Sequence, residues 1–169
     1  SNEARRGMND LEAVFEYGPS LKYFFKGDDS SQDALFVDFN FREARTLSLD
    51  SLDISSSPGV GWRKRFEQEY FNGFLSVAGA IRFEYVSDSY ADYFYGVDPA
   101  YQNESRVSYK AKGGYAGFRT SHSLRWQKGN QIISVFMAYA DIESASYVDS
   151  PLVKSTNHTY AGSAYFWLF

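Results

Sequence analysis

Apolar and polar side chains alternate with a period of two along most of this chain. The clearest case is residues 72–88, where the odd-numbered positions are mostly apolar and the even-numbered ones include the charged residues beside Phe74, Ala78 and Ala80. Successive side chains of a β-strand point to opposite faces, so this pattern predicts a two-faced strand. The polar parity includes Arg82 and Glu84. The apolar parity consists mainly of Leu75, Val77, Ile81, Phe83 and Tyr85.

The same period recurs in further segments, so the sequence predicts about seven strands. Their ranges are 11–25, 34–42, 60–71, 72–88, 115–127, 132–143 and 159–169. Most of them run to ten residues or more. That length exceeds the roughly 5 to 6 residues of an average globular strand and matches the roughly 9 to 11 that cross a bilayer at a tilt. Strand length therefore favours a membrane-spanning sheet.

The predicted connections alternate between short and long. A C-terminus on the periplasmic side would place the connections at 26–33, 71–73 and 127–130 in the periplasm. The long polar loops would then all be external, at 47–59, 88–113 and 150–158. An outer-membrane barrel shows this asymmetry of short periplasmic turns and long external loops.

The chain ends in SAYFWLF, with Tyr165, Trp167 and Phe169 on one face of the last predicted strand. On that face they would meet lipid and the interfacial aromatic girdle. A terminal Phe after alternating aromatics also resembles the signal that the barrel assembly machinery reads. We therefore predict an all-β fold, an antiparallel up-and-down transmembrane β-barrel of the outer-membrane type, with residues 1–169 as a single domain.

Composition narrows the function classes further. The chain has 169 residues, a formal net charge of -4 and no cysteine. The acidic balance argues against a nucleic-acid-binding protein, which would normally show a basic face. The lack of cysteine removes disulfide-stapled folds and thiolate metal sites. No stretch reaches the roughly 18 to 20 apolar residues of a membrane-spanning helix.

The charged residues of the polar parity carry both signs in similar number. In a narrow barrel they would form cross-strand ion pairs that fill the lumen, in preference to a conducting pathway. The predicted lumen-facing charges are Glu12, Glu16, Lys22, Asp38, Arg42, Arg63, Arg65, Glu67, Glu69, Arg82, Glu84, Arg119 and Arg125.

Candidate catalytic and metal-binding residues are few. His122 stands between Ser121 and Ser123, but neighbouring strand residues point to opposite faces, so it cannot simply pair with either serine. The other histidine, His158, falls in a predicted loop. The spacing of Asp88, Asp92 and Asp98 fits no calcium-binding loop pattern. We predict no catalytic residue, no metal site and no cofactor, and hence a protein that is not an enzyme.

Several separated motifs resemble the MipA/OmpV family (MltA-interacting protein, OmpV-like outer-membrane proteins). They are ARRGMNDLEAVFEYGPSL, YFYGVDPAYQ, GGYAGFR, DSPLV and the closing Phe. The resemblance implies the outer membrane of a Gram-negative bacterium, with its lipid and the barrel assembly machinery as partners. It also implies a scaffold in the cell envelope that links a murein lytic transglycosylase to a penicillin-binding murein synthase. Other family members are associated with adhesion or with osmotic and antibiotic responses.

Members of this family normally carry a signal peptide and further strands ahead of the RRGM segment, so the resemblance implies that the N-terminal part is lacking. Bacterial single-chain barrels have an even number of strands, so seven would leave unpaired edges. Further strands, a second copy of the chain or a different strand count would resolve this. Two other functions stay open, namely a small pore or solute channel and a soluble lipocalin-like ligand-binding barrel.

Overall fold

The computed structural model describes residues 3–168, without the side chains of Glu67 and Gln68. Its main element is one antiparallel sheet, which confirms the predicted all-β antiparallel fold. The strands are β1 (Val14–Tyr17), β2 (Ser20–Lys26), β3 (Asp33–Thr46), β4 (Ser51–Tyr70), β5 (Gly73–Val86), β6 (Gly114–Lys128), β7 (Gln131–Asp141) and β8 (Asn157–Trp167). The helical elements are α1 (Asp88–Tyr95) and two 3-10 turns, η1 (Glu3–Arg5) and η2 (Pro99–Tyr101).

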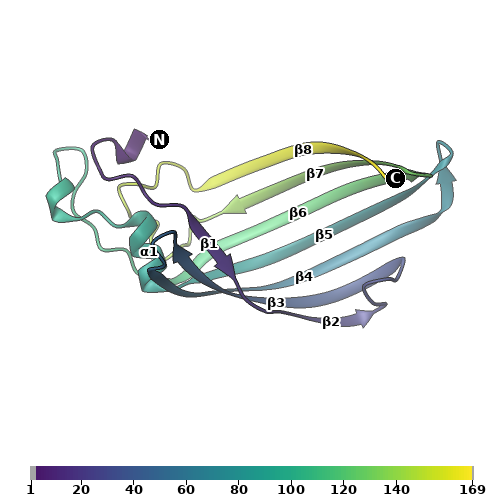
Figure 1. The fold of residues 1–169 in the computed structure, drawn as a ribbon, viewed down its shortest axis with the longest axis horizontal. Coiled ribbons are helices and arrows are strands. Elements are labelled where there is room, and N and C mark those ends of the chain that lie inside the picture. The colour runs from purple at the N-terminus through teal and green to yellow at the C-terminus, as the bar shows by residue number, and fades with distance from the viewer. Residues whose placement is uncertain (1–2, 169) are drawn as a thin grey trace.

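The strands follow the order β1-β3-β4-β5-β6-β7-β8, and β2 also pairs with β3. Since β1 and β2 lie along the same edge of β3, the sheet has seven rows of strands, as predicted. The sheet curls into a half-barrel (Figure 1). Within residues 3–168 no ladder joins β8 to β1 or β2, so both edges of the sheet are unpaired there.

The predicted strand at 11–25 is divided at Gly18 and Pro19. Gly18 has a φ of +151°, and a Cβ on it would lie 2.2 Å from the carbonyl oxygen of Phe41, so only glycine fits here. The pairing register is the same on both sides of the break. Tyr17 lies opposite Glu43, and Ser20 lies opposite Asn40, three residues further along each strand. The division therefore leaves the assignment of side chains to faces unchanged.

The predicted external loop at 47–59 is wrong in extent, because β4 begins at Ser51 and only residues 47–50 connect it to β3. The serine-rich stretch pairs with β3 except at a bulge that includes Leu52 and Asp53, and Ser56 lies opposite Phe41. Ser56 also lies opposite Tyr85 of β5. Backbone pairing on both sides thus overrides the turn preference of serine, proline and glycine.

The tight turns fall where the sequence predicts them. Phe71 and Asn72 have φ values of 54° and 59° between paired Tyr70 and Gly73, which defines a two-residue hairpin turn with both residues left-handed. A second two-residue turn joins β6 to β7 through Gly129. These turns and the β2–β3 connection lie at one end of the sheet, which we call the turn end (Figure 1). The β3–β4, β5–β6 and β7–β8 connections lie at the opposite end, the loop end.

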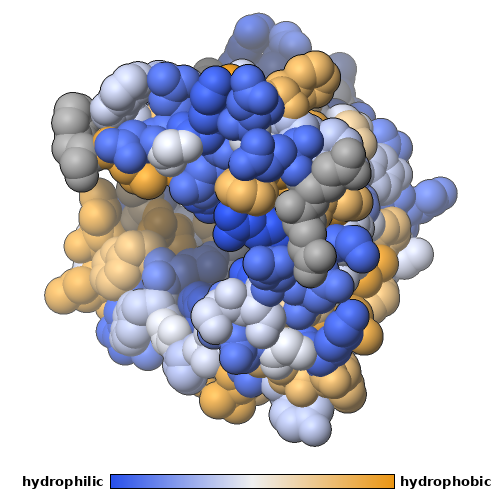
Figure 2. Space-filling model, turned by 90° about the vertical axis from the view of Figure 1, so that its right-hand side faces the viewer, coloured by the Kyte–Doolittle hydropathy of each residue, from blue (hydrophilic) through white to orange (hydrophobic). Residues whose placement is uncertain are grey.

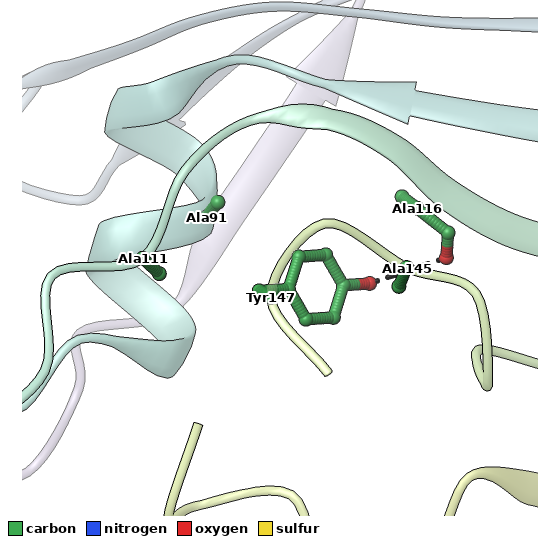
Figure 3. Packing of buried hydrophobic residues seen from close by; sticks show 5 residues of the cluster. All are labelled: Ala91, Ala111, Ala116, Ala145 and Tyr147. Carbon is green, nitrogen blue, oxygen red and sulfur yellow. Dashed lines mark hydrogen bonds between the residues drawn. The ribbon is translucent and has the colours of Figure 1, made fainter. Parts of the chain in front are cut away.

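At the loop end the long connections fold into a cap with a small core of its own. The helix α1 begins after Ser87, whose side chain accepts a hydrogen bond from the Tyr90 amide at 3.1 Å. The sequence pattern predicted only a loop over 88–113, although Ser87 and Asp88 are a typical N-cap and first-turn acid. The core of the cap consists of Ala91, Ala111, Ala116, Ala145 and Tyr147 (Figure 3).

Ring stacking and hydrogen bonds also fix the cap. The rings of Tyr95 and Tyr147 stack with centroids 4.0 Å apart, and the Tyr147 hydroxyl donates to the Ala116 carbonyl at 3.3 Å. The buried Arg106 side chain donates to the carbonyls of Tyr101 and of Ala4, which ties the N-terminal segment to the large loop.

Within residues 3–168 the chain has no helix that is long and apolar enough to span a membrane.

Candidate functional site

The two parities of the strands lie on opposite faces of the curled sheet, as predicted, except where a β-bulge shifts the register, as it does at Tyr115 of β6. One row of directly opposed residues on the polar face runs across β2 to β6 and consists of Lys22, Asp38, Gly59, Arg82 and Arg119. A cavity of about 300 Å³ on the same face is lined by residues from β2 to β7. A cavity that spans so many strands requires curvature toward it, so the charged face is the concave one.

The opposite, convex face is apolar and exposed. Large apolar side chains in the middle of the strands are 42% to 51% exposed, namely Leu35, Phe39, Val60, Leu124, Val135 and Met137. An apolar surface of this extent on a folded chain indicates contact with a membrane or a partner. Figure 2, viewed from the turn end, shows hydrophilic residues beside the hollow of the molecule and hydrophobic patches around its outside.

Aromatic residues mark both ends of the convex face. Near the turn end are Phe25, Tyr70, Trp126, Tyr165 and Trp167. Near the loop end are Phe15, Tyr85, Tyr115, Phe118 and Tyr139. Several of these rings touch one another, such as Tyr85 and Tyr115 with centroids 5.6 Å apart. Two aromatic bands that flank an apolar band are typical of outer-membrane barrels.

An ion pair between Arg82 and Asp38 spans the middle of the concave face. These side chains come from β5 and β3, and they meet above Gly59 of the intervening β4. A Cβ on Gly59 would lie 2.6 Å from Arg82 Cγ and 2.7 Å from Asp38 Oδ1, so glycine makes room for the pair. The Asp38 side chain is only 7% exposed, whereas the neighbouring pair of Arg119 and Glu84, at 3.3 Å, is far more exposed.

At the turn end, residues 27–32 fold over the concave face. The Nη2 atom of Arg63 donates to the carbonyls of Asp28, Asp29 and Ser31 at 2.9 to 3.0 Å, and Lys22 pairs with Asp29 at 3.1 Å. Hydrogen bonds from Ser30 and Ser31 lower the pKa of the Asp28 carboxyl from 3.8 to about 2. Because this pKa is lowered in the folded chain, the stabilisation of the fold by the Asp28 carboxylate is complete above about pH 4. It is lost as the pH falls toward 2.

At the loop end, α1 contributes Tyr90 to the concave face. Its hydroxyl donates to Glu16 Oε1 at 3.0 Å. Burial and the adjacent Glu16 carboxylate raise the pKa of Tyr90, so the phenol stays protonated and remains a donor. Glu12 lies ahead of β1 and accepts hydrogen bonds from the Ser48 amide and hydroxyl at 2.9 Å, so it anchors the N-terminal segment to the β3–β4 turn.

Apart from Glu12, which lies ahead of β1, and Glu67, whose side chain is not described, the predicted lumen-facing charges lie along this face without forming one cluster. Arg42 donates to the carbonyls of Gly18 and Pro19, and Glu69 ends the row at the turn end opposite Phe74. Tyr165 and Trp167 are exposed on the convex face of β8. The Glu67 side chain and the whole of Phe169 lie outside the described residues. That these residues line a lumen or form an assembly signal stays a prediction.

The candidate catalytic and metal residues do not assemble into a site within the described part of the chain. His122 lies opposite Gly79 on the convex face, while Ser121 and Ser123 lie opposite Ala80 and Ala78 on the concave one. His158, predicted in a loop, is in β8 instead, opposite Ala140, because that strand begins at Asn157.

The three loop aspartates have structural roles. Asp88, Asp92 and Asp98 each accept a hydrogen bond from a backbone amide, at 2.6, 2.9 and 2.8 Å respectively. Each carboxylate thereby satisfies a donor of the large loop that has no strand partner. No group of three or more potential metal ligands occurs among the residues that the structure describes.

Comparison with known proteins gives one match. The family described as MltA-interacting protein MipA matches residues 1–169, the whole length of the chain. No curated protein matches the chain, and no solved structure matches it. Of these comparisons, only the one with protein families relates the chain to known proteins.

Proposed function

The chain belongs to the MltA-interacting protein MipA family, and from this premise we propose that it is an outer-membrane β-barrel protein of a Gram-negative bacterium that acts as a scaffold. The observation that carries the membrane part of the proposal is the convex face, with its exposed apolar band between two aromatic bands. Such a face is stable against lipid and would aggregate in water.

In this proposal the concave face becomes the filled interior of the barrel. The pairs Arg82–Asp38 and Arg119–Glu84, together with the inward fold of residues 27–32, support a plugged lumen rather than a solute channel. Unpaired backbone groups are costly in hydrocarbon, so the edges at β8 and at β1 and β2 must be closed by further strands or by a second copy. Tyr165, Trp167 and Phe169 would form the signal for the assembly machinery.

The scaffold role proposed here is to bind a murein lytic transglycosylase and, through it, a penicillin-binding synthase. The family name supports a transglycosylase of the MltA type as the first partner. Murein lies on the periplasmic side, so contact should occur at the turn end. The most exposed large hydrophobic residue among those described there is Phe71, which is 93% exposed on the β4–β5 turn.

Retention of a purified MltA-type transglycosylase on the immobilised full chain in nanodiscs tests this role. We expect retention by the wild type and weaker retention by Phe71→Asn. Asparagine tolerates the positive φ of this position, so the substitution removes the ring and keeps the turn. Asn130→Ser in the neighbouring β6–β7 turn is the control and should bind as the wild type does. No retention by the wild type would contradict the proposed partner.

The orientation can be tested separately, because the chain has no cysteine. Ser105 lies in an exposed part of the large loop, and Asn130 lies in a turn at the opposite end. Each can be replaced by a single cysteine, as Ser105→Cys or Asn130→Cys. We expect a membrane-impermeant maleimide to label Ser105→Cys on intact cells and to label Asn130→Cys only after the outer membrane is opened. The reverse pattern would invert the topology, and labelling of both on intact cells would contradict membrane insertion.

A further inference from the structure

Three arginines converge on one cavity at the turn end of the concave face. Arg65 of β4 lies opposite Ser76 of β5, which in turn lies opposite Arg125 of β6. Arg63 occupies the adjacent concave row, opposite Ala78. The cavity has a volume of about 230 Å³ and is also lined by residues 29–32 and by Gln127.

Among the residues whose side chains the structure describes, no ion pair balances the charge of this cluster. Among the described residues no carboxylate lies within 4.0 Å of Arg63, Arg65 or Arg125, whereas Arg82 and Arg119 on the same face each have one. Asp29 also lines the cavity, but its carboxylate pairs with Lys22. A recess with uncompensated charge of one sign concentrates counter-ions.

The contacts of the three guanidinium groups are with uncharged partners and leave donors available. Arg63 is held through Nη2 by three backbone carbonyls. Arg65 lies over the ring of Phe74, with its Cζ 4.9 Å from the centroid, and Arg125 donates one bond to Gln127 at 3.1 Å. Each guanidinium has five N–H donors, so most of those on Arg65 and Arg125 remain unused by the described residues.

The floor between the arginines is made of small side chains. Ser76 separates Arg65 from Arg125, and Ala78 and Ser123 follow in the next row. Strands two places apart are about 10 Å from each other, so a small group above Ser76 can receive bonds from both sides. The structure therefore offers space, positive charge and converging donors in one place.

We propose that Arg63, Arg65 and Arg125 form a binding site for a phosphate group. A dianionic phosphate offers acceptor oxygens in the geometry that the planar guanidinium fork matches. Its two negative charges also balance more of the charge of three arginines than the one charge of a carboxylate would. Arg63 positions the β2–β3 connection as one wall, while Arg65 and Arg125 supply the free donors. The proposal uses only the geometry of the concave face and does not depend on the partner or the membrane orientation.

Calorimetric titration of the full chain in neutral detergent with inorganic pyrophosphate tests the site. The wild type should bind one equivalent, more weakly at higher salt. Arg65→Ala combined with Arg125→Ala should weaken binding by about tenfold or more, as expected when charge-assisted hydrogen bonds are lost. Arg125→Gln alone should weaken pyrophosphate binding by a smaller factor. Because Arg125 is exposed, this substitution should leave the fold intact, as an unchanged near-ultraviolet circular dichroism spectrum would show.

Lys64→Ala is the matched control, because it removes one positive charge from the same strand on the opposite face. It should bind pyrophosphate as the wild type does. No binding by the wild type, or an equal loss with Lys64→Ala, would overturn the proposal. Repeating the titration in mixed micelles that contain phosphatidylglycerol, with phosphatidylcholine for comparison, identifies the source. Competition of phosphatidylglycerol with pyrophosphate indicates a lipid headgroup, and unchanged affinity indicates a soluble phosphate.

Discussion

Replacing Ile81 by arginine is expected to lower the free energy of unfolding in phospholipid bilayers by about 2 to 4 kcal/mol, the range for a basic residue at the midplane on the lipid face of a barrel. Ile81 is near the middle of β5 on the convex face, opposite Val60 and Thr120. The arginine would have to bring its charge into hydrocarbon or bend toward the interface. Urea titration followed by tryptophan fluorescence measures the change.

Ser121→Arg is the matched control for this substitution. Ser121 is one residue beyond Thr120, the partner of Ile81, and it faces the cavity of about 300 Å³ on the concave side. The same charge would there enter an open cavity on the concave side instead of hydrocarbon, so the loss should be well below half of that for Ile81→Arg. Equal losses for the two variants would contradict a lipid-facing convex surface.

The assignment of side chains to faces could be predicted because antiparallel pairing preserves parity across the sheet. The Gly18–Pro19 break shows how far this holds, since the register of β1 and β2 against β3 is continuous and Tyr17 keeps the face that parity assigns to it. A local interruption that adds no residue to either strand leaves the two-residue period intact.

The extent of β4 could not be predicted in the same way. Residues 51–59 are rich in serine and include Pro58 and Gly59, which are typical of loops. They form a strand because β3 supplies hydrogen-bond partners on one side and β5 does so on the other side from Ser56 onward, a property of neighbours that are distant in sequence. The positive φ of Asp53, 62°, marks the irregularity where this pairing begins.

The concave site was only partly predictable. Alternation placed Asp38 and Arg82 on one face, but which charges meet depends on the stagger between strands, and their pairing across Gly59 follows from the register alone. The inward fold of residues 27–32 depends on carbonyl contacts with Arg63, which no side-chain pattern shows. The clustering of Arg65 with Arg125 likewise required the position of Ser76 between them.

Arg82→Ala is expected to cost about 3 kcal/mol of unfolding free energy, because it leaves the Asp38 carboxylate buried without its counter-ion. Asp38 is 7% exposed, and its Oδ1 atom has no hydrogen-bond partner among the described residues. The Arg82 side chain is 34% exposed, so water can reach part of the vacated space. This places the expected cost near the lower end of the range of about 3 to 5 kcal/mol for breaking a buried pair.

Arg119→Ala is the control, because Arg119 lies directly opposite Arg82 and pairs with Glu84 in a more exposed setting, with side-chain exposures of 55% and 35%. Its loss should cost about 1 kcal/mol or less. The double variant Asp38→Asn with Arg82→Gln should lose less than Arg82→Ala, since no buried charge remains unpaired. A loss for Arg82→Ala no greater than that for Arg119→Ala would show that water already screens Asp38, and the concave face would then be an open aqueous passage rather than a filled one.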